Sequence, residues 1–291
     1  MEHLSLKPGA VVVDGTVGLG GHSLEMAARI APEGILLAFD WDEQMLDVAK
    51  ERLSKIEHVE VRFFHCDYRR IPQVVTDVGL TRVDAILLDM GLNNAQIEDD
   101  SRGMSFRRSG PLDMRMDRSS GQPASDLVNE WSAAEIETVL HDYGDENWAK
   151  KIAQVIVDRR KLNRLETTDQ LVDCVLAAIP AAKRQRGIHP ATRTFQAIRI
   201  AVNGELEGLI EAVEQAAQCL SLGGRMVVLT YHSGEDRAVK RAFRSLSESD
   251  EFSLPFKKPL IPSQSEVASN PKSRSAKLRA IHRVRISQEA A

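Results

Sequence analysis

Short apolar runs recur along the first third of the chain, and a polar or helical stretch follows each of them. Because nearly every position in these runs is apolar, they are typical of strands that are buried on both faces. The predicted strands cover residues 10–15, 35–40, 59–64 and 84–90. The stretches HSLEMAARIA and EQMLDVAKERLSKI between them have the apolar spacing of helices. This alternation predicts an α/β fold, with a parallel sheet and helices on both of its faces.

The alternation stops near residue 93, and no clear strand follows before residue 218. Residues 101–117 have the polar, glycine- and proline-containing composition of a loop. Helical spacing returns after this loop, and Ser132 and Thr168 are the predicted N-caps of two of the helices. The predicted helices cover residues 132–142, 147–162, 167–179 and 191–218.

The strand pattern resumes at residues 223–233, and two last strands are expected within 252–260 and 277–286. We therefore predict an α/β domain that a helical insertion interrupts after the fourth strand. The expected domain boundaries are residues 1–103 and 216–291 for the α/β domain and 104–215 for the insertion.

Composition places the chain among ordinary globular proteins, with 43% hydrophobic and 27% charged residues. No apolar run approaches the ~20 residues of a membrane span, and the N-terminus lacks the pattern of a signal peptide. The three cysteines are far apart, so neither a disulfide framework nor a metal site is indicated. These features favour a reducing compartment and no membrane.

The net charge of −4 argues against indiscriminate binding of nucleic acids, but the basic residues are unevenly distributed. Residues 150–164 hold six basic residues and one acid, and residues 181–203 hold five basic residues and no acid. Residues 257–285 hold eight basic residues and one acid. Each stretch alone is typical of a solvated face, but three together indicate contact with a nucleic acid.

The stretch DGTVGLGGH, residues 14–22, follows the first predicted strand and resembles a ligand-binding turn. Asp14, Asp40 and Asp89 each stand at or near the end of a predicted strand. In an open α/β sheet, ligands bind outside the carboxyl ends of the strands. We therefore expect these three carboxylates to lie along one binding edge.

The turn fits phosphate-containing ligands poorly. A dinucleotide turn needs a third glycine, where this chain has Ser23, and a triphosphate turn needs a lysine, which is missing here. S-adenosylmethionine has a sulfonium cation, an amino-acid end and a ribose, so acidic residues suit it. Asp40 stands twenty residues after Gly20, at the spacing expected of a ribose-binding acid. The turn therefore favours S-adenosyl-L-methionine over a nicotinamide cofactor.

Three longer motifs follow the turn in order, at residues 87–117, 189–209 and 223–241. They include GPLDMRMD, HPATRTFQA and YHSGEDR, which have no general structural reason to occur together. Between about residue 6 and about residue 245, the chain resembles the MraW/RsmH family of 16S ribosomal RNA (cytosine-N4) methyltransferases.

The resemblance implies a class I (Rossmann-like) S-adenosylmethionine-dependent methyltransferase domain, with a helical insertion that helps to hold RNA. The reaction it implies is methylation of the N4 amine of a cytidine in the decoding region of small-subunit ribosomal RNA. The partner would be that RNA or an assembling 30S-type subunit. The family's cofactor-binding positions fall on Gly20, Gly21, His22, Asp40, Tyr68, Asp89 and Gln96.

The chain departs from the family pattern at four places. Residues 93–95 are Asn-Asn-Ala where the family usually has a serine-serine-proline stretch, and Gly234 stands where a leucine is usual. Tyr68 replaces the usual phenylalanine, and the H-x-P-V-L segment that precedes the family's first strand is missing.

The cytosine N4 amine is a poor nucleophile, so the enzyme has to position it and accept the charge that develops on nitrogen. Asp89 is the candidate acceptor, with Asn93 and Asn94 beside it in sequence. Asp89 could equally contact only the cofactor, and both roles stay open. A general-base role for His22 is disfavoured, because the amine need not lose its proton before it attacks.

Candidate substrate-binding residues come from the longer motifs. Arg193 and Arg199 flank Phe195 on a predicted helix, either as solvated residues beside a core phenylalanine or as phosphate ligands. Asp113 and Arg115 either brace their loop through an ion pair or shape the cytidine pocket. For His232, contact with RNA or a place in the pocket wall is more plausible than hydrolase chemistry.

Other function classes remain as alternatives. The chain could be a catalytically weak, RNA-binding ribosome assembly factor, or a methyltransferase that acts on another nucleic acid or on protein. The sequence leaves the oligomeric state open, including a homodimer. The expected location is the cytoplasm, with an organelle of bacterial descent as the alternative.

Overall fold

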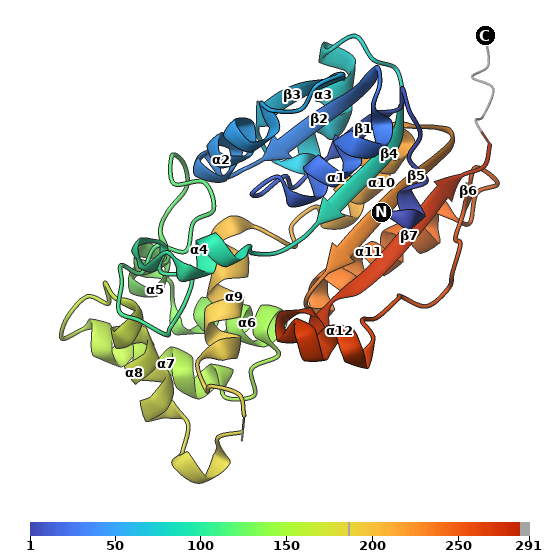
Figure 1. Ribbon diagram of the computed structural model, residues 1–291. Coiled ribbons are helices and arrows are strands. Elements are labelled where there is room, and N and C mark those ends of the chain that lie inside the picture. Colours follow the sequence, from blue (N-terminus) through green and yellow to red (C-terminus); the bar gives the residue numbers. More distant parts are fainter. Residues whose placement is uncertain (186, 286–291) are drawn as a thin grey trace. The chain divides into compact units, whose positions relative to one another are not determined.

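A seven-stranded mixed sheet forms the centre of the first of two units into which the chain divides (Figure 1). The computed structural model describes residues 1–185 and 187–285. The sheet unit consists of Met1–Gly91 and the chain from Gly208 onward, and the helical unit is Leu92–Glu207. Arg186, which belongs to one of the basic stretches, lies outside the described residues.

The strand order across the sheet is β3-β2-β1-β4-β5-β7-β6. Its strands are β1 (Val11–Asp14), β2 (Gly34–Asp40), β3 (Val59–His65), β4 (Val83–Asp89), β5 (Leu220–Thr230), β6 (Phe252–Ser253) and β7 (Lys277–Arg283). The first five strands are parallel to one another, whereas β7 is antiparallel to both β5 and β6. The predicted α/β fold class is confirmed.

The strand expected within residues 252–260 is much shorter than predicted. Only Phe252 and Ser253 pair with β7, and Leu260 adds one isolated bridge to Leu278. Pro255 and Pro259 explain the difference, because proline cannot donate a hydrogen bond to a neighbouring strand.

Helices cover both faces of the sheet. They are α1 (Gly21–Ile30), α2 (Glu43–Leu53), α3 (Ile71–Asp77), α10 (Leu209–Gln218) and α11 (Ser233–Leu246), whereas the short α12 (Gln264–Ser269) contacts the 3₁₀ helix Pro271–Ser275. Leu36 and Ala38 point to the same face of β2, where Leu36 packs with α1 and Ala38 with α2. Helix α10 contacts α3, α11 and β5. Both faces of the central strands are therefore buried, which explains their continuous apolar runs.

The second unit is built from helices around a core of its own. They are α4 (Asn94–Glu98), α5 (Ala124–Glu130), α6 (Ala133–Gly144), α7 (Ala149–Arg160), α8 (Thr168–Ala178) and α9 (Thr192–Asn203). Ser132 caps α6 as predicted, but the N-cap of α8 is Thr167, because its hydroxyl and Gln170 complete a capping box. No helix among the described residues is long and apolar enough to cross a membrane.

The single helix expected over residues 191–218 is two helices. Gly204 and Gly208 adopt positive φ angles of 56° and 62°, which end α9 and precede α10. Because α10 contacts α3, α11 and β5, it belongs to the sheet unit. Leu92 packs against the helical core. The units therefore divide at Leu92 and Gly208 rather than at residues 104 and 216.

Candidate functional site

Three carboxylates stand at the carboxyl ends of three neighbouring strands. Asp14, Asp40 and Asp89 are the last residues of β1, β2 and β4, and β1 lies between the other two in the sheet. Among the described residues, no lysine or arginine forms an ion pair with any of them. This row of acids, which is expected from the sequence, gives this edge of the sheet a negative charge.

Asp14 holds the glycine turn in place through hydrogen bonds. Its side chain is fully buried, and its two oxygens accept hydrogen bonds from the Ser23 hydroxyl at 2.7 Å and the Thr16 N–H at 3.2 Å. Burial raises the pKa of this carboxyl. Because Ser23 is in the first turn of α1, Asp14 ties the start of this helix to the end of β1 and leaves ligand contact to other residues.

Asp40 connects β2 to the glycine turn. Its Oδ2 accepts the N–H of Gly18 at 2.7 Å, and its Oδ1 accepts the N–H of Asp42 at 2.8 Å. Burial raises the pKa of Asp40 to about 6, although both hydrogen bonds favour the ionised form. Each carboxylate oxygen has a second lone pair, so Asp40 can still accept hydrogen bonds from a ligand hydroxyl.

The turn itself needs its glycines. Gly18 and Gly20 have φ angles of 51° and 77°, in the left-handed region that residues with a Cβ rarely adopt. Above Gly21 the space is open, since a Cβ built there meets no atom within 4 Å. The N-terminus of α1 also has no side-chain cap. The turn therefore offers exposed backbone to a ligand.

Asp89 is held by three neighbours. Its N–H donates to the Thr16 hydroxyl at 2.7 Å, and its Oδ1 accepts the Tyr231 hydroxyl at 2.7 Å. Its Oδ2 lies 3.5 Å from Nδ1 of His22. Burial raises the pKa of Asp89, while the bond from Tyr231 lowers it. Asp89 is therefore a fixed acceptor at the edge of the sheet.

Sequence reasoning missed Tyr231, which follows β5. Because β5 lies beside β4, with Leu229 opposite Asp89, the first residue beyond β5 reaches the same edge of the sheet. Burial raises the pKa of the Tyr231 hydroxyl, so this group stays protonated as a donor. The sequence LTYHS does mark the end of a strand, but placing Tyr231 near Asp89 also requires knowing that this strand lies beside β4.

Tyr68 also lies close to the turn. It begins a 3₁₀ helix, Tyr68–Arg70, that follows β3, and its Cβ lies 3.2 Å from where a Cβ on Gly15 would stand. The structure therefore gathers Gly20, Gly21, His22, Asp40, Tyr68 and Asp89 at the carboxyl edge of one sheet. Exposed backbone and uncompensated carboxylates suit a ligand that carries positive charge and hydroxyl groups.

The remaining candidates except His232 belong to the helical unit. Asn93 caps α4, where its Oδ1 accepts the N–H of Gln96 at 2.9 Å. The Oε1 of Gln96 in turn accepts the N–H of Asn93 at 3.1 Å, and Gln96 is buried. Asn94 is exposed in the first turn of α4. The geometry thus gives Asn93 and Gln96 a structural task, the capping of a short helix.

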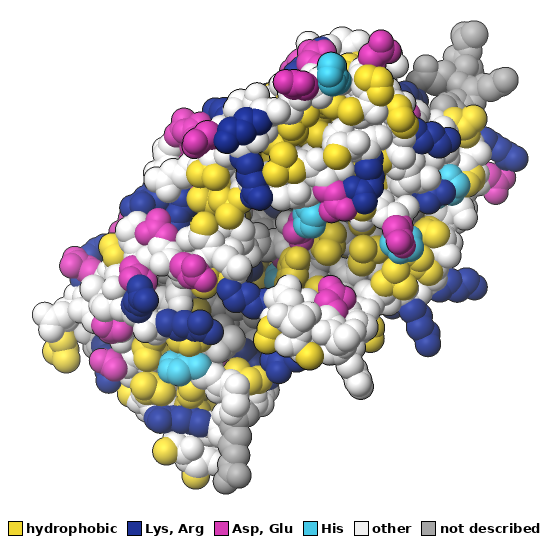
Figure 2. Space-filling view, in the orientation of Figure 1, with side chains coloured by type: hydrophobic (Ala, Val, Ile, Leu, Met, Phe, Trp, Pro, Cys, Tyr) yellow, Lys and Arg dark blue, Asp and Glu magenta, His cyan; other side chains and the backbone are white. Residues whose placement is uncertain are grey.

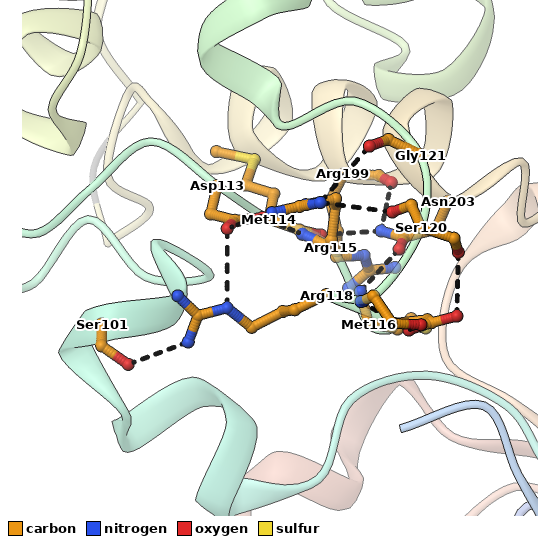
Figure 3. A network of polar contacts seen from close by, with 12 residues as sticks. Ser101, Asp113, Met114, Arg115, Met116, Arg118, Ser120, Gly121, Arg199 and Asn203 are labelled. Carbon is orange, nitrogen blue, oxygen red and sulfur yellow. Dashed lines mark hydrogen bonds and ion pairs between the residues drawn. The ribbon is translucent and has the colours of Figure 1, made fainter. Parts of the chain in front are cut away.

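Asp113 and Arg115 pair with each other. The Nε and Nη2 of Arg115 donate to the two carboxylate oxygens of Asp113 at 2.8 and 3.0 Å (Figure 3). This bidentate pair holds the pKa of Asp113 below its ordinary value despite partial burial. Of the two roles considered for these residues, the geometry favours the bracing of their loop.

Arg199 and Phe195 do not have the substrate contacts that were considered for them. The guanidinium of Arg199 donates to both oxygens of Glu205 at 2.7 Å, so its charge is neutralised. Phe195 is buried in the helical core, and its ring meets Phe106 edge to face. Arg193 has no carboxylate partner among the described residues, and its Nη1 donates to the carbonyl of Asp145 at 3.2 Å.

His232 is also a structural residue. The strand that was expected to include it ends at Thr230, and His232 is the N-cap of α11. Its Nδ1 accepts the N–H of Glu235 at 3.4 Å, and its side chain is only 10% exposed. This geometry argues against the RNA contact predicted for it, because little of the side chain is accessible.

Comparison with known proteins adds a consistent set of relatives. Residues 1–284 match the model of the MraW methylase family. The ribosomal RNA small subunit methyltransferase H of Geobacter sp. (strain M21) is 44% identical, over 98% of this chain and 96% of that protein. The proteins of that name from Citrifermentans bemidjiense and Clostridioides difficile (strain 630) are 43% and 39% identical, with the same two coverages.

Proposed function

The chain belongs to the MraW methylase family, and from that membership we propose that it methylates the N4 amine of a cytidine in the decoding region of small-subunit ribosomal RNA. The observation that carries the proposal is the similarity over nearly the whole chain to proteins named ribosomal RNA small subunit methyltransferase H. The same similarity does not favour a catalytically weak assembly factor. We place the reaction in the cytoplasm, where ribosomal subunits assemble.

The cofactor in this proposal is S-adenosylmethionine, which supplies an electrophilic methyl group when bound. The residues at the carboxyl edge of the sheet fit it, because Asp40 and Asp89, which have no lysine or arginine partner among the described residues, suit a ligand with a sulfonium cation and an ammonium group. Asp40 would accept the ribose hydroxyls, and the backbone of the turn, which has open space above Gly21, would lie against the ligand at Gly20 and Gly21. Tyr68 and His22 would complete the walls of the site.

Asp89 is the proposed group at the reacting end of the site. Tyr231 and Thr16 fix it before any substrate arrives, so little reorganisation is needed when charge develops on the amine nitrogen. An ionised carboxylate there can accept an N–H of the amine and stabilise that charge. His22, whose Nδ1 lies 3.5 Å from Oδ2 of Asp89, need not act as a base.

The helical unit is the proposed RNA-binding part of the chain. It contains two of the three basic stretches, residues 150–164 and 181–203. Such stretches contribute sequence-independent affinity for phosphates. We also propose Gln96, Asn93 and Asn94 as contacts to cofactor or substrate, in addition to the hydrogen bonds by which Asn93 and Gln96 cap α4.

The function is tested by mass spectrometry of small-subunit ribosomal RNA from cells with and without this protein. We expect one cytidine of the decoding region to lose the mass of a single N4 methyl group when the protein is absent. Purified protein with S-adenosylmethionine should restore that methyl group on the unmodified RNA. An unchanged modification pattern in the deletion strain would rule the proposed reaction out.

Cofactor affinity should fall on acidification through the pKa of Asp40. Because burial raises that pKa to about 6, Asp40 is mostly ionised at neutral pH and mostly protonated a unit below its pKa. A protonated carboxyl is a weaker acceptor for ribose hydroxyls, so the Kd should rise about tenfold between pH 7 and pH 5. Calorimetric titration with S-adenosylmethionine at several pH values measures this change.

The variant Asp40→Asn tests whether the ionisation of Asp40 causes this pH dependence. It should bind the cofactor more weakly at pH 7 and lose the pH dependence around 6. Asp47→Asn, which changes an exposed residue of α2 that pairs with Lys50, should behave as the wild type. Equal affinity of Asp40→Asn and the wild type at every pH would remove Asp40 from the site.

A further inference from the structure

The helical unit contains a basic hollow that none of the roles above explains. It lies where the ends of α6 and α8 and the start of α9 come together. The lining residues that matter here are Trp148, Lys183, Arg184, Ile188, His189 and Arg193. On the face shown in Figure 2, Lys and Arg side chains lie among hydrophobic ones over the lower part of this unit.

Two arginines of the hollow are oriented by backbone carbonyls rather than by carboxylates. Arg184 donates from Nη2 to the carbonyl of Leu176 at 2.8 Å and from Nε to that of Ile179 at 3.2 Å, at the end of α8. Arg193 donates to the carbonyl of Asp145, just beyond α6. These bonds fix the guanidinium groups without cancelling their charge.

The hollow carries a net positive charge. In the part of the chain that the structure describes, no carboxylate pairs with Lys183, Arg184 or Arg193. Arg115 and Arg199 of the same unit, in contrast, are each paired with an acid. Glu146 also lines the hollow, and its Oε1 accepts the N–H of Trp148 at 2.9 Å. Three positive charges thus face one negative charge in a concave site.

Aromatic rings give the hollow a second property. Trp148 is half-buried at the start of α7 and contributes to the lining. The ring of His189 stacks on Phe106, with centroids 4.5 Å apart and planes 17° apart. Nδ1 of His189 accepts the N–H of Ala191 at 3.2 Å, so Nε2 carries the proton of the neutral ring as a donor. A flat apolar surface therefore adjoins the cations.

We propose that this hollow binds a phosphodiester of single-stranded RNA through Arg184, Arg193 and Lys183, with the adjoining base against Trp148. The inference rests on the proposed function, which makes RNA the substrate. Guanidinium groups match the geometry of phosphate oxygens, and every base has a π-face that can stack on an aromatic ring. The hollow would hold a nucleotide other than the reacting cytidine and add affinity without reading its sequence.

The test compares two double variants that remove equal charge from the helical unit. Arg184→Gln with Arg193→Gln changes the hollow, whereas Lys150→Gln with Lys151→Gln changes two exposed lysines of α7 that do not line it. The probe is a fluorescein-labelled single-stranded RNA with the decoding-region sequence, and its fluorescence anisotropy is followed over a series of salt concentrations. A thermal unfolding curve of each variant checks its fold.

We expect the hollow pair to bind the RNA at least about tenfold more weakly, and its salt slope to fall by about 0.7, the contribution of the one phosphate that the hollow binds. The lysine pair should change both quantities less. Arg184→Lys with Arg193→Lys, which keeps both charges, should retain most of the salt slope. RNA should quench tryptophan emission in the wild type and less in Trp148→Phe.

The proposal is overturned if the hollow pair binds RNA as tightly as the lysine pair, or if a poly-glutamate peptide of equal charge competes as well as RNA. The second result would assign the hollow to an acidic protein surface. Methyl transfer by the wild type is measured in parallel on unmodified ribosomal RNA. If the wild type transfers the methyl group and the hollow pair binds RNA as the lysine pair does, the inference about the hollow fails and the proposed function stands. If the wild type shows no methyl transfer, the proposed function itself is contradicted.

Discussion

Replacing Asp89 with alanine should abolish methyl transfer, with a loss of at least about a hundredfold in rate. Asp89 is placed at the end of β4 by Thr16 and Tyr231, and among the described residues no lysine or arginine neutralises it. Alanine removes both acceptor oxygens from the edge of the sheet. The measurement is the rate of tritium transfer from labelled S-adenosylmethionine to unmodified small-subunit RNA.

The same variant separates the two roles that Asp89 could have. If Asp89 accepts an N–H of the amine, Asp89→Ala loses its single-turnover rate and keeps the wild-type Kd for S-adenosylmethionine. If Asp89 holds the cofactor, the Kd rises together with the loss of rate. Full activity of Asp89→Ala contradicts both roles.

Tyr231→Phe tests the hydrogen bond between Tyr231 and Asp89, because it removes one hydroxyl and leaves the ring. The Tyr231 hydrogen bond lowers the pKa of Asp89, so its loss should raise that pKa further above the ordinary value of 3.8. Activity that requires ionised Asp89 is lost as pH falls through its pKa. The acid limb of the rate profile should therefore shift to higher pH in Tyr231→Phe, with a smaller loss at neutral pH than in Asp89→Ala.

The strand ends of this site could be predicted from the sequence, because they depend on local pattern. Asp14, Asp40 and Asp89 each follow an apolar run, and parallel strands bring their carboxyl ends to one edge. The contact between Asp89 and Tyr231 could not be predicted in the same way. It joins residues 142 positions apart and exists because β5 pairs with β4.

Two arginines of the helical unit show a second limit of prediction from the sequence. Arg199 has the spacing of an exposed helix residue, and only the chain reversal after α9 brings Glu205 back to it. That reversal depends on the positive φ of Gly204, inside a stretch whose apolar spacing alone predicts one continuous helix. Arg199 is therefore neutralised, while Arg193, six residues earlier, keeps its charge. Pattern alone does not distinguish the two arginines.

Asn203→Asp should lower the free energy of unfolding of the helical unit by about 2–4 kcal/mol. The buried amide of Asn203 donates to the carbonyls of Met114 and Arg199, both at 2.8 Å, and accepts the N–H of Met116 at 2.8 Å (Figure 3). Aspartate has the same shape but places an oxygen where both donors were. Two carbonyls then lose their partner, and a buried charge faces them.

Met114 makes this site more sensitive than an ordinary hydrogen bond. It is fully buried with a φ angle of 63°, a conformation that costs a residue with a side chain about 1 kcal/mol. Its carbonyl is held by Asn203 and its N–H by the carbonyl of Arg102 at 2.8 Å. Without the amide of Asn203, the loop of residues 110–117 loses one of the two bonds that keep Met114 in this conformation.

Guanidinium unfolding of the full chain, followed by tryptophan emission, measures the effect. Trp131 and Trp148 pack against the helical core, so much of the emission change reports on this unit. Asn163→Asp, on an exposed asparagine of the same unit, is the control and should change the free energy by less than about 0.5 kcal/mol. If Asn203→Asp unfolds at the same denaturant concentration as this control, the amide of Asn203 does not hold the loop. The conformation of Met114 must then be maintained by the packing of its buried side chain.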